Sequence, residues 1–529
     1  MRYMLLVFLI TGTGMGKWAV APNYRALDRI EGAYSGGGNK ITPCDTIGSI
    51  PDMRAALGTP GKNIAVRGDT VVVIYGPPSN DPDNIFLGVR AAYSFDGGHT
   101  YSYFDLSTTQ VRRIYPGVIW PENWDSPLFF WQEARYESGV YLPSKIFIAY
   151  DLAFPNGVFT VEELPNSEDW DVWLPSADAS GDTIIVFAVN VMSSFLTFYW
   201  RTYDMGETWV SDTFPGGWID TPIPRIGHDG YIALITDRVV DYGWEALTPF
   251  FLESLDGGQT WIDTINLWDA CGWTPYDSAG GWWYVYDFVL DTSDRPHISW
   301  KFGAGSLEYG DCWYIGPAEG SPGAWEGWEM KLIAGEGDGT PVATQPTITY
   351  DPENDMLFYT LKAFYIVGTD TLPHIGLFYT GDLGEHWMEI GPWGDPDEVE
   401  ESAFELPVIS GGGWSSGLHA SFADDYFCHA GPYYVGIGEG EENTGAELFD
   451  LFLSPGGRLV LSLDLENTSY VGIKLYDSAG RLAEDLYRGP LEKGYHELEF
   501  DIRGRKSGVY FVRAEVDGKS SSRKLILVR

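Results

Sequence analysis

Three segments of the chain combine tryptophans with carboxylates, the residue types that proteins use to bind sugars. They are residues 162–173, 266–283 and 392–401. A flat aromatic ring stacks on the C–H face of a sugar, and carboxylates accept hydrogen bonds from its hydroxyl groups. The candidate ligand-binding residues are Trp170, Asp171, Trp173, Trp268, Asp269, Trp273, Trp282, Trp283 and Trp393. In the alternative interpretation, these tryptophans fill gaps between sheets and the acidic residues are solvated.

A second set of carboxylates recurs in one turn pattern, Ser/Thr-x-Asp-x-Gly-x-Thr/His-aromatic. An aspartate can accept hydrogen bonds from turn N–H groups, and the glycine supplies backbone freedom. Each copy follows one short apolar run and precedes another, as expected of a tight hairpin. We therefore predict a structural role for the four aspartates, which are Asp96, Asp204, Asp256 and Asp382.

The spacing of these turns predicts the elements that carry them. Asp204 and Asp256 are 52 residues apart, and the other two intervals, 108 and 126 residues, are about twice that. Such periods suit four-stranded units arranged radially, with one unit lacking the turn in each long interval. We predict an all-β fold, a seven-bladed β-propeller over residues 40–437 with six blades as the alternative. The N-terminal segment would complete the last blade.

This repeat resembles the Asp-box (BNR) repeat of sialidase-like β-propellers, a family that includes sialidases, other glycosidases and non-catalytic proteins. A sialidase needs three arginines for the substrate carboxylate, a Tyr/Glu pair and an acidic proton donor. Its Phe/Tyr-Arg-Ile-Pro motif does not precede the first box, and residues 113–116 hold only a scrambled version. The catalytic residues are unknown. The sequence favours a secreted, carbohydrate-binding propeller of unassigned activity, either non-catalytic or with a catalytic site that no motif reveals. A sialidase-type glycoside hydrolase and an extracellular protein-interaction scaffold are the alternatives.

The C-terminal segment has a different character. A glycine- and charge-rich linker is predicted over residues 438–447, followed by a small immunoglobulin-like β-sandwich over residues 448–529. Its Gly508-Val509-Tyr510-Phe511 strand and its closing strand, in which Arg523 and Lys524 precede Leu525-Ile526-Leu527, resemble the type A sorting domain of the type IX secretion system. The resemblance implies the type IX machinery as a partner. It also implies a secreted or outer-surface location on a Gram-negative-type bacterium.

The N-terminus agrees with export. Arg2 precedes an apolar run, Met4 to Ile10, and Ala19-Val20-Ala21 offers small residues for cleavage. Residues 1–21 are therefore predicted to be a signal peptide. No later segment reaches the length of a transmembrane helix, so none is expected in the mature protein.

The charge balance limits the partners. The chain has 75 acidic and 33 basic residues, a net charge of −42. Residues 450–529 hold 13 Lys/Arg and 12 Asp/Glu, which leaves 20 basic against 63 acidic residues in the first 449. Because an acidic surface of this size repels phosphate backbones, nucleic acid is not an expected partner.

Four cysteines are present: Cys44, Cys271, Cys312 and Cys428. Their spacing fits no zinc motif, so neither a metal nor a cofactor is predicted. In an oxidising compartment, Cys44 and Cys428 are candidates for a disulfide that closes the ring. Cys271 and Cys312 are a second candidate pair near the fifth blade. Free buried thiols are the alternative for all four.

Overall fold

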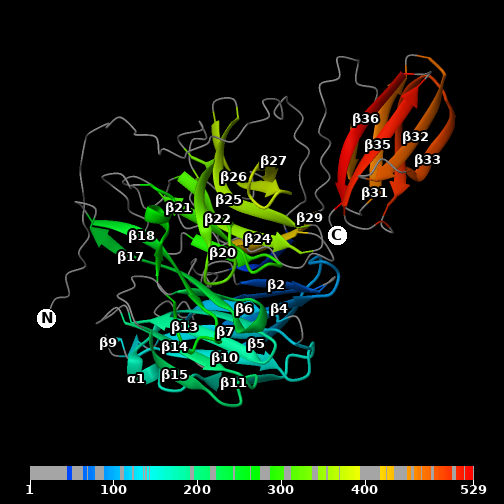
Figure 1. Ribbon diagram of the computed structural model, residues 1–529. Coiled ribbons are helices and arrows are strands. Elements are labelled where there is room, and N and C mark those ends of the chain that lie inside the picture. Colours follow the sequence, from blue (N-terminus) through cyan, green and yellow to red (C-terminus); the bar gives the residue numbers. More distant parts are fainter. Residues whose placement is uncertain are drawn as a thin grey trace.

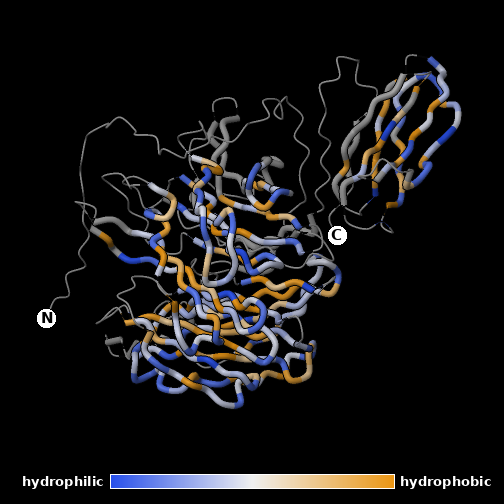
Figure 2. The backbone as a smooth tube through the Cα atoms, in the orientation of Figure 1, coloured by the Kyte–Doolittle hydropathy of each residue, from blue (hydrophilic) through white to orange (hydrophobic). Residues whose placement is uncertain are grey.

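The architecture follows from short apolar runs separated by tight turns. The computed structural model (Figure 1) describes residues 45–49, 63–67, 70–77, 88–107, 112–121, 124–134, 136–137, 140–141, 143–190, 196–214, 222–241, 245–262, 264–273, 286–302, 311–335, 343–352, 355–367, 370–393, 418–423, 426–433, 450–453, 458–465, 467–477, 482–502, 505, 508–516 and 519–527. The described part is nearly all β. Figure 2 shows that apolar residues follow its strands. The predicted signal peptide and linker lie outside these residues.

Six four-stranded antiparallel sheets follow one another along the chain. Sheets one to three contain β2 (Ile64–Arg67), β3 (Thr70–Tyr75), β4 (Val89–Ser94), β5 (Ser102–Ser107); β6 (Arg112–Ile119), β7 (Leu128–Ala134), β10 (Lys145–Asp151), β11 (Phe159–Glu163); and β12 (Trp173–Ser180), β13 (Thr183–Val189), β14 (Thr197–Thr202), β15 (Val210–Phe214). A hairpin of β8 (Tyr136–Glu137) and β9 (Val140–Tyr141) extends the second sheet's loop.

Sheets four to six repeat the same order. They contain β16 (Ile223–Ile226), β17 (Ile232–Asp241), β18 (Glu245–Ser254), β19 (Ile265–Asn266); β20 (Tyr286–Leu290), β21 (Pro296–Phe302), β22 (Asp311–Glu319), β23 (Glu326–Ala334); and β24 (Ala343–Asp351), β25 (Met356–Val367), β26 (Asp370–Thr380), β27 (Met388–Trp393). The short helices are α1 (Ser167–Trp170), η2 (His228–Gly230) and α2 (Leu267–Ala270).

A three-stranded sheet joins the two ends of this region. It contains β28 (Leu418–Ala423) and β29 (Tyr426–Tyr433), with the N-terminal strand β1 (Asp45–Ser49) at its edge. Strand β1 pairs antiparallel with β29, so that Thr46 lies opposite Cys428. Strand β28 in turn contacts β2 of the first sheet. The N-terminal segment therefore adds a strand to the last sheet, as the sequence predicted.

The sheets stack face to face, and this explains why strands such as Thr70–Tyr75 are apolar on both faces. Five clusters of buried side chains each draw on two successive sheets, from the first and second to the fifth and sixth. The first strands of neighbouring sheets also contact one another from β6 through β24. This succession is propeller-like.

The four repeated aspartates all brace their turns in the same way. In the third sheet, Thr202 donates its hydroxyl to Asp204 at 2.6 Å, and Thr208 donates both its N–H and its hydroxyl, at 2.8 and 2.6 Å. The same bonds hold Asp96 and Asp256, while His386 replaces the threonine beside Asp382. The turn glycine has a positive φ in every copy, for example 94° at Gly206, a conformation that favours glycine.

Two of these turns, those of Asp256 and Asp382, are also bonded to the preceding sheet. Tyr203 donates its hydroxyl to the carbonyl of Gly257 at 2.7 Å, and Arg201 donates to that of Gly258. Lys331 of the fifth sheet donates to the Gly384 carbonyl at 2.7 Å. These two turns therefore contribute to the contacts between sheets as well as to their own hairpins.

This geometry gives a first prediction. Asp256→Ala removes the acceptor for the hydrogen bonds from Ser254, Gln259 and Thr260. We expect this substitution to lower the free energy of unfolding by about 1–2 kcal/mol. The effect is limited because the turn is exposed, so water replaces part of the lost hydrogen bonding. The hydrogen bond from Thr260 contributes most to lowering the pKa of Asp256 to about 2. A lowered carboxyl pKa stabilises the fold above about pH 4, and this stabilisation is lost as pH falls toward 2. Chemical denaturation at several pH values should show the gap between wild type and variant narrowing in acid. A gap that is the same at pH 3 and pH 7 would contradict this assignment.

The C-terminal region forms two sheets of its own. One contains β30 (Asp450–Leu453), β31 (Arg458–Leu465) and β34 (Gly494–Asp501). The other contains β33 (Leu482–Leu491), β32 (Ser469–Asp477), β35 (Gly508–Val516) and β36 (Lys519–Leu527), in that spatial order. Leucines of β31 pack against Val471, Ile473 and Val512 of the second sheet in one buried cluster. This region is a small two-sheet sandwich.

Candidate functional site

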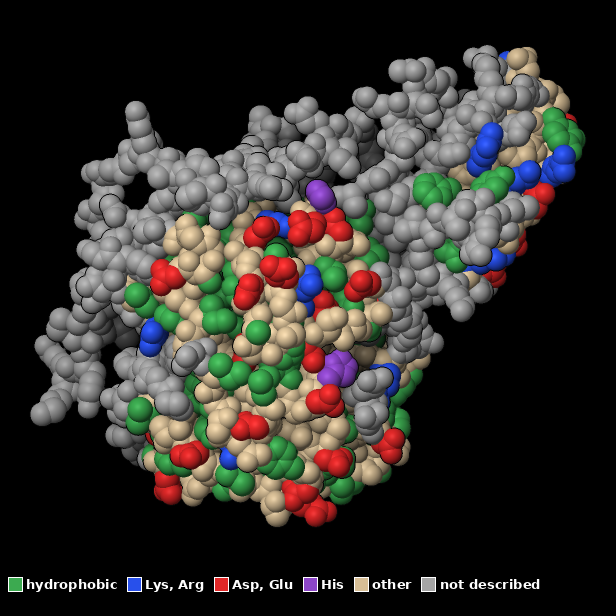
Figure 3. Space-filling view, in the orientation of Figure 1, with side chains coloured by type: hydrophobic (Ala, Val, Ile, Leu, Met, Phe, Trp, Pro, Cys, Tyr) green, Lys and Arg blue, Asp and Glu red, His purple; other side chains and the backbone are tan. Residues whose placement is uncertain are grey.

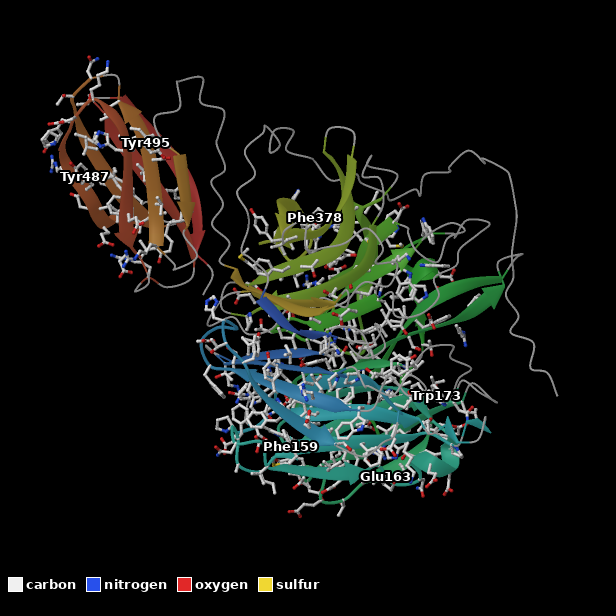
Figure 4. The ribbon with its side chains drawn as sticks, turned by 180° about the vertical axis from the view of Figure 1, so that it is seen from behind. Phe159, Glu163, Trp173, Phe378, Tyr487 and Tyr495 are labelled. Carbon is white, nitrogen blue, oxygen red and sulfur yellow. The ribbon has the colours of Figure 1, made fainter. Side chains whose placement is uncertain are left out.

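The first tryptophan- and acid-rich loop connects the second sheet to the third, and it is the most complete candidate site. Helix α1 is a single turn, entered at Asn166 (φ 63°) and left at Asp171 (φ 48°). Both residues have a left-handed backbone conformation, so the chain turns sharply at each end of the helix. The loop therefore delivers Asp171 and Trp173 to the start of β12. Figure 4 shows Trp173 and Glu163 on the same side of the propeller-like region.

Asp171 is fixed by three hydrogen bonds to one carboxylate oxygen. It accepts the N–H of Ser144 at 2.8 Å, the Ser144 hydroxyl at 3.3 Å and the Trp173 indole N–H at 3.4 Å. The Ser144 hydroxyl also donates to the Val172 carbonyl at 2.5 Å. These bonds orient the half-buried Trp173 ring beside the carboxylate.

Trp170 has a different role from Trp173. Its ring stacks on Phe198 with centroids 4.4 Å apart and also packs against Trp200. Asn190 donates to the Trp170 carbonyl at 2.7 Å. Trp170 therefore anchors the loop on the third sheet, and Trp173 is the ring better placed to receive a ligand.

Acidic side chains surround the one lysine of this site. Lys145 forms ion pairs with Glu168 at 2.7 Å and with Glu163 at 2.9 Å. The hydrogen bond to Glu168 raises the pKa of the Lys145 ammonium. Both glutamates are exposed, whereas Lys145 is buried, so the site presents carboxylates to solvent. Exposed carboxylates can accept hydrogen bonds from sugar hydroxyl groups.

The floor of the site carries backbone strain and a buried amide. Leu174 has a φ of 62° immediately before Pro175, a rare conformation for a non-glycine residue. Its N–H donates to Gln132 Oε1 at 3.1 Å, while Gln132 Nε2 is buried without a hydrogen-bond partner. Strained backbone concentrates at binding and catalytic sites. Tyr115, before Pro116 in β6, repeats the conformation with a φ of 55°.

The second loop corrects part of the sequence interpretation. Trp268 is fully buried and Trp273 is 4% exposed, with their rings edge to face at 4.9 Å between the fourth and fifth sheets. Asp269 accepts a hydrogen bond from the side chain of Asn266, the residue that caps α2. These tryptophans pack the gap between sheets, so they are not a surface for ligands. The positions of these tryptophans in the sequence do not indicate that their rings are buried.

Three further candidates remain untested. Trp282 and Trp283 lie outside the described residues. Trp393 is the last residue of β27, where its backbone pairs with Ile375.

The cysteines also differ from the sequence expectation. Cys271 and Cys312 are free and buried, in separate clusters, so they do not form the proposed disulfide. Burial raises the pKa of the Cys271 thiol, which keeps it protonated and unreactive. Cys428 lies in β29, and Cys44 lies outside the described residues.

Sequence reasoning missed a buried ion pair on the first strands of the fourth and fifth sheets. Arg225 donates to Asp287 at 2.5 Å and to the Phe288 carbonyl at 2.7 Å, and both side chains are at least nine-tenths buried. The other Asp287 oxygen lies 3.5 Å from the N–H of Ile348 in the sixth sheet. The only signal was an arginine and an aspartate within otherwise apolar strands.

Among the residues that the structure describes, no group of three or more histidines, cysteines or acids could hold a metal ion. None of the described helices has the length and apolarity required to cross a membrane.

Comparisons with known proteins do not assign this chain to a family. No protein-family model matches the chain, and no curated protein matches it either. Among solved structures, a Penicillium chrysogenum α-L-arabinanase complexed with arabinobiose is 12% identical, covering 74% of this chain and 98% of its own, with a TM-score of 0.38. A Dyadobacter fermentans protein of unknown function is 12% identical over 64% of this chain and 98% of its own, with a TM-score of 0.39. The GH93 α-L-arabinofuranosidase of Fusarium graminearum is 12% identical over 63% and 97%, with a TM-score of 0.37. At these TM-scores the similarities carry no argument about this chain.

Proposed function

We propose that this protein is an extracellular, seven-bladed Asp-box β-propeller that binds carbohydrate at Trp173, with a C-terminal immunoglobulin-like domain that directs its export. The seventh blade would be the sheet of β28, β29 and β1. The observation that carries the binding proposal is the Trp173 ring, fixed by Asp171. Asp171 also bonds to Ser144, and the next residue, Lys145, forms ion pairs with the exposed Glu163 and Glu168. An oriented ring beside carboxylates suits a sugar, whose C–H face stacks and whose hydroxyl groups donate.

The geometry favours binding over sialidase-type hydrolysis. Arg225 is buried and held by Asp287 and Phe288, so it is not available for a substrate carboxylate. The Tyr231 hydroxyl donates to Glu253 at 2.6 Å, but Trp325 and Gly323 donate to the same oxygen inside the fold. Burial, with the charge of Glu253, raises the pKa of Tyr231, so this phenol is not an activated nucleophile.

A glycan array with the purified chain tests the binding proposal, followed by titration of the best ligand. Trp173→Ala is expected to weaken binding at least about tenfold, equivalent to about 1.4 kcal/mol. Trp209→Ala is the matched control, because Trp209 is also half-buried but belongs to the turn of Asp204. Equal loss in both variants, or no binding to any glycan by the wild type, would refute this site.

The export proposal rests on the two-sheet fold of β30–β36 and on the Gly508–Val516 strand at its centre. A chain ending at residue 447, expressed in a host with type IX secretion, is expected to remain inside the cell. Its periplasmic and surface fractions are compared with those of the full chain by immunoblotting. Delivery of the truncated chain to the surface at the full-length level would show that the C-terminal domain is not the sorting signal.

A further inference from the structure

We propose that the outer face of the four-stranded sheet in the C-terminal sandwich binds a linear, carboxylate-bearing polysaccharide. This site is separate from Trp173 and goes beyond the proposed function. It is defined by the face of β32 and β35 that points away from the buried core, with Arg488 of β33 beside it.

Alternation assigns the residues of this outer face. Val471, Ile473 and Leu475 of β32 are buried in the sandwich core. The alternate residues Tyr470 and Tyr476, with Lys474 between them, must therefore point outward. Tyr470 is 56% exposed.

Strand β35 places matching residues directly opposite. Phe511 faces Tyr476 and Arg513 faces Lys474 in the antiparallel register. Directly opposite residues share a face of the sheet. Phe511 is 38% exposed and Arg513 is exposed. Arg488, opposite Gly472 on β33, is exposed as well. Three cations and three aromatic rings thus share one surface.

The charges on this face suit an anionic ligand. Lys474 and Arg513 lie directly opposite each other in the register of β32 and β35. One acid, Asp485, lies opposite Lys474 on the other side, and Glu515 lies opposite Gly472. Cations still exceed acids among these positions. An arginine binds a carboxylate through two parallel N–H bonds.

The shape of the row favours an extended polymer. Tyr470 and Tyr476 are six positions apart, which is about 20 Å along a strand. Aromatic rings thus stand at both ends of the row, with Lys474 and Arg513 between them. Such a flat row of rings and cations suits successive sugar rings that carry carboxylates.

Charge complementarity also selects this domain over the rest of the chain. The first 449 residues hold 63 acidic and 20 basic residues and would repel a polyanion. Residues 450–529 carry 13 basic against 12 acidic residues. Figure 3 shows the same contrast, with acidic side chains over the described propeller-like face and basic ones gathered on the sandwich. The sandwich therefore repels a polyanion less than the rest of the chain does.

The test is titration of the full-length chain with an oligogalacturonate of about ten sugars by calorimetry, with a neutral cello-oligosaccharide as the control ligand. The wild type is expected to bind only the anionic oligomer, and more weakly as salt screens the charges. The double variant Lys474→Gln/Arg513→Gln should bind at least about tenfold more weakly, equivalent to about 1.4 kcal/mol. Phe511→Ala should also weaken binding.

Matched controls come from the opposite sheet. Arg458→Gln removes a half-exposed cation on β31, and Tyr495→Ala removes a 67% exposed ring on β34 (Figure 4); both should bind as the wild type does. Trp173→Ala should also bind normally, which separates this proposal from the first site. The proposal is overturned if the wild type does not bind oligogalacturonate, or if Arg458→Gln weakens binding as much as the double variant. A third result would also overturn the proposal: the wild type binds no polysaccharide but self-associates, and both salt and the double variant abolish this self-association. The face would then bind an acidic protein surface instead of a polysaccharide.

Discussion

Deletion of residues 1–49 is expected to lower the free energy of unfolding of the propeller-like region by several kcal/mol. The deletion removes β1, which pairs with β29 at four positions from Asp45 to Ser49. Without it, β28 and β29 are left as a two-stranded hairpin, which has little stability of its own. Each lost hydrogen bond contributes about 1 kcal/mol. Since β28 also contacts β2, the loss weakens the junction between the last sheet and the first.

The matched control is deletion of residues 1–40, which leaves β1 in place. Thermal unfolding should give the same midpoint for this shorter deletion as for the full chain, and a lower midpoint for the longer deletion. Hydrogen exchange provides the local readout, because amides of residues 418–433 should lose protection only in the longer deletion. Identical midpoints for both deletions would mean that β1 does not stabilise the ring.

The regular features of the fold were predictable because they repeat. Hydrogen bonding, rather than catalysis, explains why the Ser94, Thr202, Ser254 and Thr380 turns look alike, and local hydrogen bonds leave a local sequence pattern. The intervals between those turns then predicted units that lack one. The sheets of β10 and β21 occupy the two long intervals.

The site was only partly predictable, because burial depends on neighbouring sheets. Trp173 and Trp268 stand in loops of similar composition, yet one ring is half-buried and the other is enclosed between two sheets. No local pattern distinguishes them. Gln132 was missed for the same reason, since its partner Leu174 is 42 residues away in the next sheet. Contacts of this kind require the stacking of sheets to be known first.

Asp287→Ala is expected to lower the free energy of unfolding by about 3–5 kcal/mol, because it leaves the buried Arg225 guanidinium without its counter-ion. The substitution should also weaken the contacts between neighbouring sheets. Asp287 bonds to the first strand of the fourth sheet through Arg225 and lies within 3.5 Å of the Ile348 N–H in the sixth. Removing it therefore loosens three neighbouring sheets at once.

Urea denaturation of three variants separates this pair from ordinary surface charges. Asp105→Ala breaks the exposed pair with Arg90, which has a similar distance of 2.7 Å, and should cost no more than about 1 kcal/mol. The double variant Arg225→Met/Asp287→Ala should be more stable than Asp287→Ala alone, because no unpaired charge is then buried. It should not regain full stability, since Asp287 also accepts the Phe288 N–H at 2.8 Å. If Asp287→Ala costs no more than Asp105→Ala, then Arg225 finds another partner or water, and the buried pair does not hold the first strands together.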